Sequence, residues 1–465
     1  MNLPRIGALA RRPGAVLPGR RHGRRRPARI GGRSTAWEWL SLPAPCLVSR
    51  SPEMSTTPQH EQQKTFRRRA FVAGAVTAGA AAALVRPAAV RGTSANAKIE
   101  IGVIGQGGRG RWISGLFAEH PGYKIAAVAD YFPHVANAAG DALGVDKNRR
   151  YSGLLGYQRL IDSKVDAVVL ETPPWVFPEH ARAALAAGCH VYMAKPVACD
   201  VPGCLAIAEL GKKATQQKKV FLVDFQIRTE PNWQECVKRA RAGALGKIAL
   251  VASHYFDEGW PDPPKTKDIS SRFTNLIWVN DVDLGGGMLV NAGIHAIDGS
   301  LWILGDQAPV SAVGASRRGR KNPVGDSHDV FSITYEFADG TLLNHVGEHL
   351  QNNNAEPFCG CFAYGQGAYF QGEYNGRTWL RGGPQAFKGD TVQNLYAEGA
   401  RRNIAAFHKS IVEGVYDNPT VAPSVNSTLA CILGREAGLA GGKVTWDEML
   451  RAARKIEVDT TGLIQ

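Results

Sequence analysis

A lysine and a histidine occupy positions in the sequence that suit proton transfer. Lys195 ends an apolar run, and the following Pro196 favours an extended Lys195, so that its ammonium group would point off the end of a strand. In the stretch GGGMLVNAGIHAID, helical spacing places Asn291 and His295 on one face, with Asp298 one turn further. An imidazole there can accept a hydroxyl proton near neutral pH, while the same pattern also fits a histidine that packs its helix against a sheet.

A glycine-rich turn offers a phosphate site. It lies between an apolar run and a helical pattern and consists of Gly105, Gln106, Gly107, Gly108, Arg109 and Gly110. Such a turn lets the backbone approach a pyrophosphate at the amino end of a helix. Asp130 ends the next apolar run, twenty residues after Gly110, where a carboxylate can accept the hydroxyl hydrogens of an adenosine ribose and would repel a 2′-phosphate. Tyr131 and the two residues after it include no Arg or Lys, so the pattern predicts NAD rather than NADP.

Further polar groups follow other predicted strands. In the segment ETPPWVFPEH, the turn at Thr172 and Pro173 and the imidazole of His180 are expected to border the nicotinamide side of the same cleft. Arg228 and Trp260 are candidate contacts for a bound sugar, and each fits a surface or core position equally well.

The elements that must position these groups alternate along the first half of the chain. Apolar runs typical of buried parallel strands are IEIGVIG, YKIAAVAD, VDAVVLET, HVYMAK and VFLVDF. Between them, WVFPEHARAALAAG and VPGCLAIAELGKKATQQ have helix formers with apolar residues at helical spacing. This alternation predicts a Rossmann-type, doubly wound parallel sheet over residues 98–225, with its ligand at the carboxyl ends of the strands.

The second half has a different pattern. Strands with hairpin turns at Ala338-Asp339-Gly340 and Tyr374-Asn375-Gly376 indicate a largely antiparallel sheet. Helical patterns return at residues 397–413 and 424–441. We therefore expect an α+β domain over residues 226–465 that binds substrate and forms oligomers. The open sheet predicts a homo-oligomer, either a dimer or a tetramer.

The first 97 residues account for the net charge of +14. They hold 17 Lys and Arg against 3 Asp and Glu, so residues 98–465 are formally neutral and no nucleic acid partner is expected. Residues 54–97 resemble a twin-arginine export signal, with Arg68-Arg69 before a short alanine-rich run and Ala95-Asn96-Ala97 for a signal peptidase. The run is too weakly apolar for a stable membrane anchor, which predicts a periplasmic or otherwise exported protein. Residues 1–53 are expected to be disordered or to precede the true start at Met54.

The cysteines predict neither a disulfide framework nor a metal site. Seven of the eight follow the first 97 residues, an odd number without metal-ligand spacing. Cys359 and Cys361 are the one close pair, and small buried residues on a strand explain them.

Taken in order, these motifs resemble the Gfo/Idh/MocA family, named for glucose-fructose oxidoreductase, inositol dehydrogenase and a rhizopine catabolism protein. The resemblance rests on the glycine turn, TPPWVFPEH, the Lys-Pro pair and GGGMLVNAGIHAID, and it extends from Lys98 onward. It implies oxidation of a secondary alcohol of a sugar, cyclitol or derivative, with hydride transfer to NAD or NADP. Lys195 matches the lysine that touches both substrate and nicotinamide, and His295 matches the proton-accepting histidine.

Two residues depart from the family pattern. Ala194 stands where the family commonly has Glu, and Asn291 stands where inositol dehydrogenase-like members have Asp. Without that carboxylate, His295 lacks a partner that would raise its basicity, so Lys195 could share or take over the role of base.

Three functions remain compatible with the sequence. The first is an exported NAD-dependent oxidoreductase that keeps its cofactor bound, because free NAD is scarce outside the inner membrane. The second is a glycoside hydrolase or lyase that uses NAD transiently in an oxidation, elimination and reduction cycle. The third is a protein that binds cofactor and sugar without turnover. The sequence names neither the sugar nor the oligomeric state.

Overall fold

A computed structural model of the chain describes residues 98–259, 269–273, 277–321, 325–350, 352 and 357–465. All of them belong to one compact unit. The predicted export signal, the segment before it and Trp260 lie outside the described residues. Of the helices that are described, none is long and apolar enough to cross a bilayer.

The first half folds into a six-stranded parallel sheet in the order β3-β2-β1-β4-β5-β6. Its strands are β1 (Ile99–Ile104), β2 (Tyr123–Asp130), β3 (Arg150–Ser152), β4 (Ala167–Leu170), β5 (His190–Ala194) and β6 (Phe221–Asp224). The strand order reverses between β1 and β4, which is where a doubly wound sheet forms its ligand crevice. The predicted Rossmann-type sheet is confirmed, and the short β3 is a strand that the apolar runs did not reveal.

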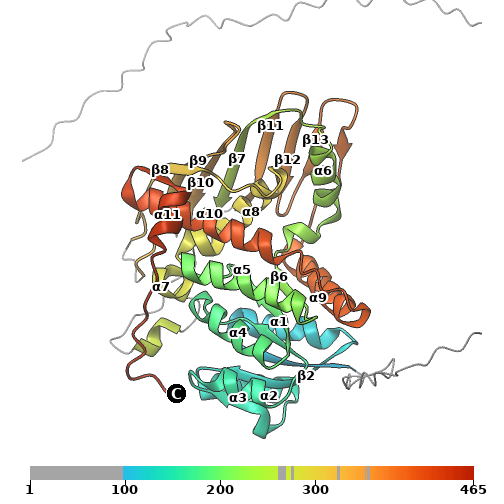
Figure 1. The fold of residues 1–465 in the computed structure, drawn as a ribbon, viewed down its shortest axis with the longest axis vertical. Helices are drawn as coiled ribbons and strands as arrows, with labels where there is room; N and C mark the ends of the chain where they lie inside the picture. Colours follow the sequence, from blue (N-terminus) through green and yellow to red (C-terminus); the bar gives the residue numbers. More distant parts are fainter. Residues whose placement is uncertain (1–97, 260–268, 274–276, 322–324, 351, 353–356) are drawn as a thin grey trace, which may run out of the picture. The chain divides into compact units, whose positions relative to one another are not determined.

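Helices cover both faces of this sheet (Figure 1). They are α1 (Gly108–Glu119), α2 (Pro133–Leu143), α3 (Gly156–Asp162), α4 (Phe177–Ala186) and α5 (Val201–Gln216). The local sequence explains why α5 begins at Val201. The Asp200 side chain caps the helix by accepting from Gly203 N, and Pro202 lies in the first turn. A helix from much later in the chain, α9 (Leu395–Glu413), also buries apolar side chains in the core beside α1 and β1.

The second sheet has nine strands in the order β14-β13-β12-β11-β7-β10-β9-β8-β15. They are β7 (Ile248–Phe256), β8 (Ser311–Arg317), β9 (Val330–Glu336), β10 (Leu342–Glu348), β11 (Phe358–Gly365), β12 (Tyr369–Glu373), β13 (Thr378–Arg381), β14 (Phe387–Lys388) and β15 (Lys443–Thr445). All neighbouring pairs are antiparallel except β7 with β10. This agrees with the predicted α+β domain and its largely antiparallel sheet.

One face of the second sheet is covered and the other is open. Contacts to the covered face come from α6 (Pro231–Arg241), α8 (Ile294–Ile303) and α10 (Val421–Ala440). Because successive side chains of a strand point to opposite faces, every second side chain points to the open face. These side chains include the exposed Leu250, Val313, Leu342 and Tyr364. Two short helices, α7 (Val282–Gly285) and α11 (Trp446–Ala452), complete the described elements.

The segment after α11, residues 453–465, runs back to the first sheet (Figure 1). Ile456 N donates to Asp200 Oδ2 at 2.8 Å, and Ile464 N donates to the Tyr131 hydroxyl at 3.2 Å. Leu154 N donates to the Ile464 carbonyl oxygen at 2.8 Å, and Leu463 is buried. This C-terminal segment therefore contacts the end of β2 and the loop after β3.

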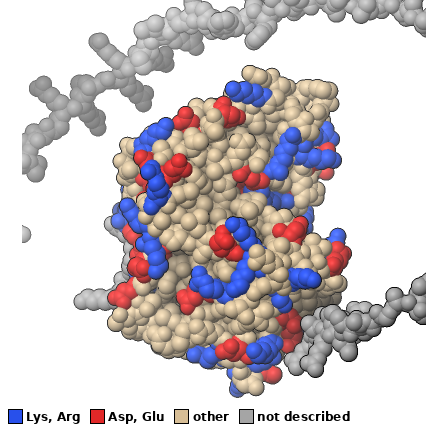
Figure 2. All heavy atoms as spheres, viewed as in Figure 1, with Lys and Arg blue, Asp and Glu red and all other residues tan. Residues whose placement is uncertain are grey.

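The surface charge agrees with the composition. On the face shown in Figure 2, basic and acidic side chains of the described residues are interspersed. The seven cysteines of the described part are free, and within it no three His, Cys, Asp or Glu side chains are grouped so as to hold a metal ion.

Candidate active site

A cavity of about 500 Å³ lies at the carboxyl edge of the parallel sheet. Lys195, Asn291 and His295 line it, so the structure brings together the three residues proposed for catalysis. Six aromatic side chains form part of the remaining wall: Trp112, Phe177, Tyr255, Trp278, Tyr374 and Tyr396. Apolar and aromatic walls with a few convergent polar groups are typical of small-molecule sites.

Lys195 enters the cavity from the residue after β5. Its Nζ donates a hydrogen bond of 2.5 Å to the backbone carbonyl oxygen of Asn291. Burial and, after it, the Arg109 guanidinium lower the pKa of Lys195 to about 7, against the opposite effect of the Asp224 and Glu171 carboxylates. Near neutral pH the amine is therefore present in both its charged and its neutral form.

Asn291 and His295 are held by an irregular helix. The regular helix expected to carry Asn291 and His295 is interrupted, because two left-handed glycines follow α7 and a π-helical turn Leu289–Gly293 precedes α8. Gly286 and Gly287 both have φ near +82°, a conformation that glycine adopts without steric cost. The Asn291 carbonyl oxygen that accepts from Lys195 Nζ lies within this π turn.

His295 is a buried neutral imidazole. Burial, followed by the positive charges of Lys195 and Arg109, holds its pKa well below the usual range. Its Nδ1 has no hydrogen-bond partner among the described residues, and its ring packs edge-on against Tyr374. Asn291 therefore does not orient the His295 ring, as a carboxylate at position 291 would. Asp298, expected one turn further on the same face, does not line the cavity.

A row of strand-end residues lies beside Lys195. Because Leu170 pairs with Met193 and Ala194 pairs with Asp224, the next residue after β4, Glu171, lies in line with Ala194 and Asp224. The Arg109 side chain crosses over the Ala194 methyl group, which lies between the carboxylates of Glu171 and Asp224. It forms a close ion pair with Asp224, and its Nε lies 3.0 Å from Glu171 Oε2. Sequence reasoning missed Glu171 and Asp224, although both end apolar runs as Asp130 does.

Two aromatic residues complete the environment of the Arg109 guanidinium. Its Nη1 donates to the Tyr396 hydroxyl at 2.5 Å, and its guanidinium lies over the rings of Trp112 and Tyr396. Those two rings stack with centroids 4.5 Å apart. The Arg109 side chain therefore faces the row of carboxylates and the cavity, and its backbone belongs to the glycine turn.

A second cavity, of about 120 Å³, adjoins the glycine turn. Its lining includes the predicted cofactor residues Gly105, Gly107, Asp130, Tyr131, Thr172, Pro173 and His180. The Asp130 carboxylate accepts from Gln106 N at 2.7 Å and from Phe132 N at 3.0 Å, and burial raises its pKa. Each oxygen retains a lone pair for a ribose hydroxyl.

The residues of this turn fit a dinucleotide. A Cβ on Gly107 or Gly108 would meet open space, whereas one on Gly110 would lie 1.9 Å from the Gly105 carbonyl oxygen, so the third glycine is needed for packing. The amino end of α1 has neither a side-chain cap nor an acidic residue in its first turn. Its free N–H groups and helix dipole suit a pyrophosphate, and Asp130 suits the adenosine ribose.

Two predicted cofactor residues lie differently from expectation. The Gln106 side chain is buried and bonded to Ser114, so only its backbone N–H reaches the Asp130 side of the turn. His180 stacks on Tyr157 with centroids 4.1 Å apart and lines the cavity that contains Asp130, not the one that contains Lys195. Its burial lowers its pKa to about 3, as for a neutral packing residue.

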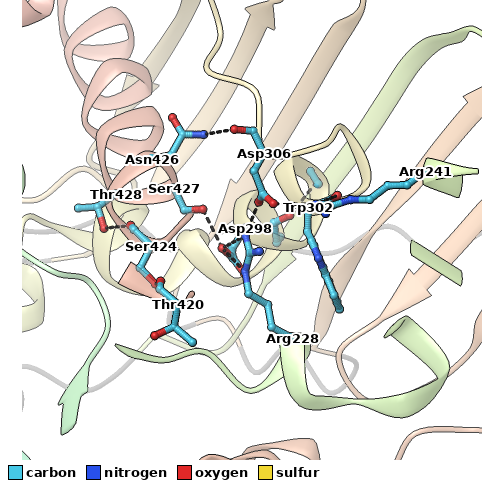
Figure 3. Close-up of polar contacts among 12 residues, drawn as sticks. Arg228, Arg241, Asp298, Trp302, Asp306, Thr420, Ser424, Asn426, Ser427 and Thr428 are labelled. Carbon is cyan, nitrogen blue, oxygen red and sulfur yellow. Dashed lines mark hydrogen bonds and ion pairs between the residues drawn. The ribbon is translucent and has the colours of Figure 1, made fainter. Parts of the chain in front are cut away.

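Arg228, a candidate sugar contact, does not line either of these cavities. Its guanidinium forms a fork with the buried Asp298 carboxylate, at 2.8 Å and 2.9 Å for the closest pairs, and also binds Asp306 at 2.7 Å (Figure 3). Ser427 donates to the same Asp298 carboxylate at 2.7 Å. Arg228 is therefore a structural residue that ties the segment after β6 to α8 and α10.

Family models match both halves of the chain. The model described as "Oxidoreductase family, NAD-binding Rossmann fold" matches residues 99–225, and that described as "GFO/IDH/MocA C-terminal domain" matches residues 233–357. Together these ranges cover more than half of the chain. The chain belongs to the Gfo/Idh/MocA family. Its first sheet is the NAD-binding Rossmann domain of that family.

Similar Gfo/Idh/MocA proteins include inositol 2-dehydrogenase 2 of Saccharopolyspora erythraea, 27% identical over 53% of this chain and 65% of that protein. The chain thus spans slightly less than two thirds of that relative. Aldose-aldose oxidoreductase of Caulobacter crescentus has a TM-score of 0.58 at 21% identity, covering 75% of this chain and 99% of that one. GenD2 from gentamicin A biosynthesis, solved with NAD, has a TM-score of 0.60 at 18% identity, covering 76% and 98%. At these identities the structural likeness shows the fold.

Proposed function

We propose that this protein oxidises a secondary hydroxyl group of a sugar, of a cyclitol such as inositol, or of a derivative of these. The observation that carries the proposal is that Lys195 and His295 line one buried cavity beside the NAD-binding turn. An amine that is half-neutral near neutral pH and an unpaired imidazole suit removal of a hydroxyl proton.

Each residue has a distinct role in this reaction. The substrate hydroxyl binds between Lys195 and His295, and its proton passes to the neutral Lys195 amine. The Asn291 carbonyl oxygen accepts from the resulting ammonium and holds it in place. His295, neutral and without a carboxylate partner, donates or accepts a hydrogen bond at the substrate and so orients the hydroxyl group. Bound NAD supplies the acceptor for the hydride that leaves the same carbon.

The names of the relatives support this substrate class. They denote an inositol 2-dehydrogenase and an aldose-aldose oxidoreductase, which are oxidoreductases of a cyclitol and of aldoses. The aromatic wall of the cavity also suits a sugar ring, because its C–H faces pack on aromatic rings while its hydroxyls reach the few polar groups.

The protein acts after twin-arginine export and keeps NAD bound through its cycle. The support is the sequence of residues 54–97 together with an NAD-binding domain, since folded export suits a protein that acquires its cofactor in the cytoplasm. A second carbonyl substrate, or return of the hydride to the same sugar, would then restore the oxidised cofactor.

The test uses the exported full chain, purified and freed of loose nucleotide by gel filtration. We expect stoichiometric bound NAD or NADH, and turnover of myo-inositol or an aldose without added cofactor when a carbonyl acceptor is present. Cleavage of a glycoside at constant cofactor oxidation state would indicate the transient-redox hydrolase or lyase instead. The absence of any reaction across a panel of sugars and cyclitols would indicate a binding protein.

The open face of the second sheet joins copies of this chain into a dimer or tetramer. It exposes Leu250, Val313, Leu342 and Tyr364, large apolar side chains that a partner would cover. Sedimentation should therefore report an oligomer, and Leu342→Asp should shift it toward the monomer. An unchanged mass for that variant would place the interface elsewhere.

A further inference from the structure

We propose that Glu171 is a further functional residue of this site, which accepts a hydrogen bond from a hydroxyl group of the bound ligand and controls the charge of Lys195. The inference rests on the proposed function for the identity of the substrate. Its first part, contact with a ligand hydroxyl, applies equally to a hydroxyl of the substrate and to one on the nicotinamide ribose of NAD.

The Glu171 carboxylate is buried but unsatisfied. Its side chain is 1% exposed, and neither oxygen has a hydrogen-bond donor among the described residues. Arg109 Nε lies 3.0 Å from Oε2, but the N–H is not aligned with it. Because a buried acceptor without a donor is costly, we expect a bound ligand to supply the missing donor. Glu171 lines both the Lys195 cavity and the Asp130 cavity.

Asp224, at the other end of the row, provides the contrast. It accepts from Gln226 Nε2 at 2.9 Å and from Asn403 Nδ2 at 2.7 Å, and it forms a close ion pair with Arg109. The Asp224 carboxylate therefore has partners on both oxygens, and it holds the Arg109 guanidinium in place. Glu171 faces the same guanidinium as a second carboxylate, but no aligned donor among the described residues reaches its oxygens.

The position of Glu171 in the sheet explains its reach. The neighbouring residue on β5 is Ala194, whose methyl group leaves the space that the Arg109 guanidinium crosses. Lys195 follows Ala194 along the chain, so the Glu171 carboxylate lies one strand away from the Lys195 amine. An ionised carboxylate only accepts hydrogen bonds, which suits the hydroxyls of a polyol.

Charge couples Glu171 to Lys195. The groups that face Glu171 are Arg109 from α1, Asp224 from β6 and Lys195 after β5. Across the cavity lie the neutral His295 from α8 and the phenols of Tyr374 and Tyr396. Burial raises the pKa of Glu171 to about 7, and burial lowers that of Lys195 to about 7. The negative charge of Glu171 and the positive charge of Lys195 stabilise each other. Loss of the Glu171 carboxylate should therefore lower the pKa of Lys195 further.

The experiment compares Glu171→Gln with the wild type and with Glu119→Gln. Glu119 is a matched control, since it lies on the same helix as Arg109, α1, and pairs with Arg401 at the surface. NAD affinity is measured by quenching of tryptophan fluorescence, because Trp112 and Trp278 line the cavity. The pH dependence of kcat/KM is measured with the sugar or cyclitol that the wild type turns over best.

For Glu171→Gln we expect the acidic limb of the kcat/KM profile to move to lower pH by about 0.5 to 1 unit. We also expect about a 10-fold loss in one binding constant. A raised KM at unchanged NAD affinity assigns the hydroxyl to the substrate, and a weakened NAD affinity assigns it to the ribose. A profile and binding constants equal to those of Glu119→Gln would overturn the inference.

Two measurements keep the inference testable if Glu171→Gln folds poorly or if no substrate is turned over. Glu171→Asp retains the charge, so it should keep the acidic limb in place while it weakens ligand binding. The infrared band of a protonated carboxyl at pH 6 should be present in the wild type, absent in Glu171→Gln and shifted by NAD or myo-inositol. A band that is lost in Glu171→Gln but unaffected by either ligand would refute the contact. A ligand-sensitive band in a protein inactive on every sugar would instead count against the proposed oxidation alone.

Discussion

Lys195 Nζ and the Asn291 carbonyl oxygen, 2.5 Å apart, join the two domains at the cavity. The amine follows a strand of the NAD-binding domain, and the carbonyl belongs to the π-helical turn before α8. A carbonyl oxygen accepts from an amine and from an ammonium group alike, so Lys195 can gain and lose a proton without leaving its position. A base that keeps its geometry in both states is suited to reversible oxidation of an alcohol.

Activity should depend on pH through Lys195. Its pKa is lowered to about 7, and alcohol oxidation needs the neutral amine, so kcat/KM for oxidation should rise as pH increases through about 7. Reduction of the ketone needs the ammonium form and should fall over the same range. Initial rates in both directions between pH 5.5 and 8.5 check this, and two profiles that rise together would contradict it.

Replacement of Lys195 should separate catalysis from cofactor binding. Lys195→Ala should lower kcat by at least about 10³-fold, because the variant loses its base. NAD affinity should change little, since the glycine turn and Asp130 hold the dinucleotide. Steady-state rates and NAD titration test this, with the exposed Lys212→Ala as control. Turnover of Lys195→Ala at the wild-type rate would remove the assignment.

Replacement of His295 should have a smaller effect. His295→Ala should lower kcat about 10²-fold, because Lys195 remains as a competent base and His295 has no carboxylate to raise its basicity. A loss as large as that of Lys195→Ala would instead make the histidine the principal base. Both variants should be assayed at the same pH, since the Lys195 amine titrates near neutrality.

Asp130 should govern the choice of cofactor. Asp130→Ala should weaken NAD binding and narrow the preference over NADP, because the carboxylate bonds ribose hydroxyls and repels a 2′-phosphate. The same change removes the acceptor for Gln106 N and Phe132 N, so Asp130→Asn serves as the milder variant. Titration of the apoprotein with each dinucleotide measures the preference, and an unchanged ratio would mean that Asp130 does not face the ribose.

The ion pair of Arg228 with Asp298 should matter for stability and not for catalysis. Asp298→Ala leaves a buried guanidinium with Asp306 as its remaining carboxylate (Figure 3), which should cost about 3 kcal/mol in the free energy of unfolding. Denaturant unfolding of Asp298→Ala, Arg228→Ala and the double variant gives the coupling energy. NAD affinity should be unchanged in all three, and a selective loss of sugar binding in Arg228→Ala would restore it as a substrate contact.

The sequence predicted those parts of the site that are local in the chain. The glycine turn, the strand before it and Asp130 after the next strand form one continuous βαβ pattern, so their spacing determines their placement. Lys195 was predictable for the same reason, because it directly ends a strand at the ligand edge.

Other parts depend on relations between distant segments. The row of Glu171, Ala194 and Asp224 arises from the register of three parallel strands, and the length of an apolar run does not specify register. The regular helical spacing expected for Asn291 and His295 is interrupted by a π turn, and two left-handed glycines precede that turn. Arg228 follows a strand end as Lys195 does, yet its nearest acids, Asp298 and Asp306, come from another element.

The C-terminal segment imposes an order on assembly. Residues 453–465 leave the ribosome after all the other described residues, yet they bond to Tyr131 and Leu154 beside the Asp130 carboxylate. During synthesis the parallel sheet can therefore form first, while the adenosine end of its crevice still lacks these contacts. We expect a nascent chain that stops before residue 453 to hold NAD weakly. Cofactor loading would then wait for the synthesis of residues 453–465, and a tag or cleavage within these residues would weaken nucleotide retention.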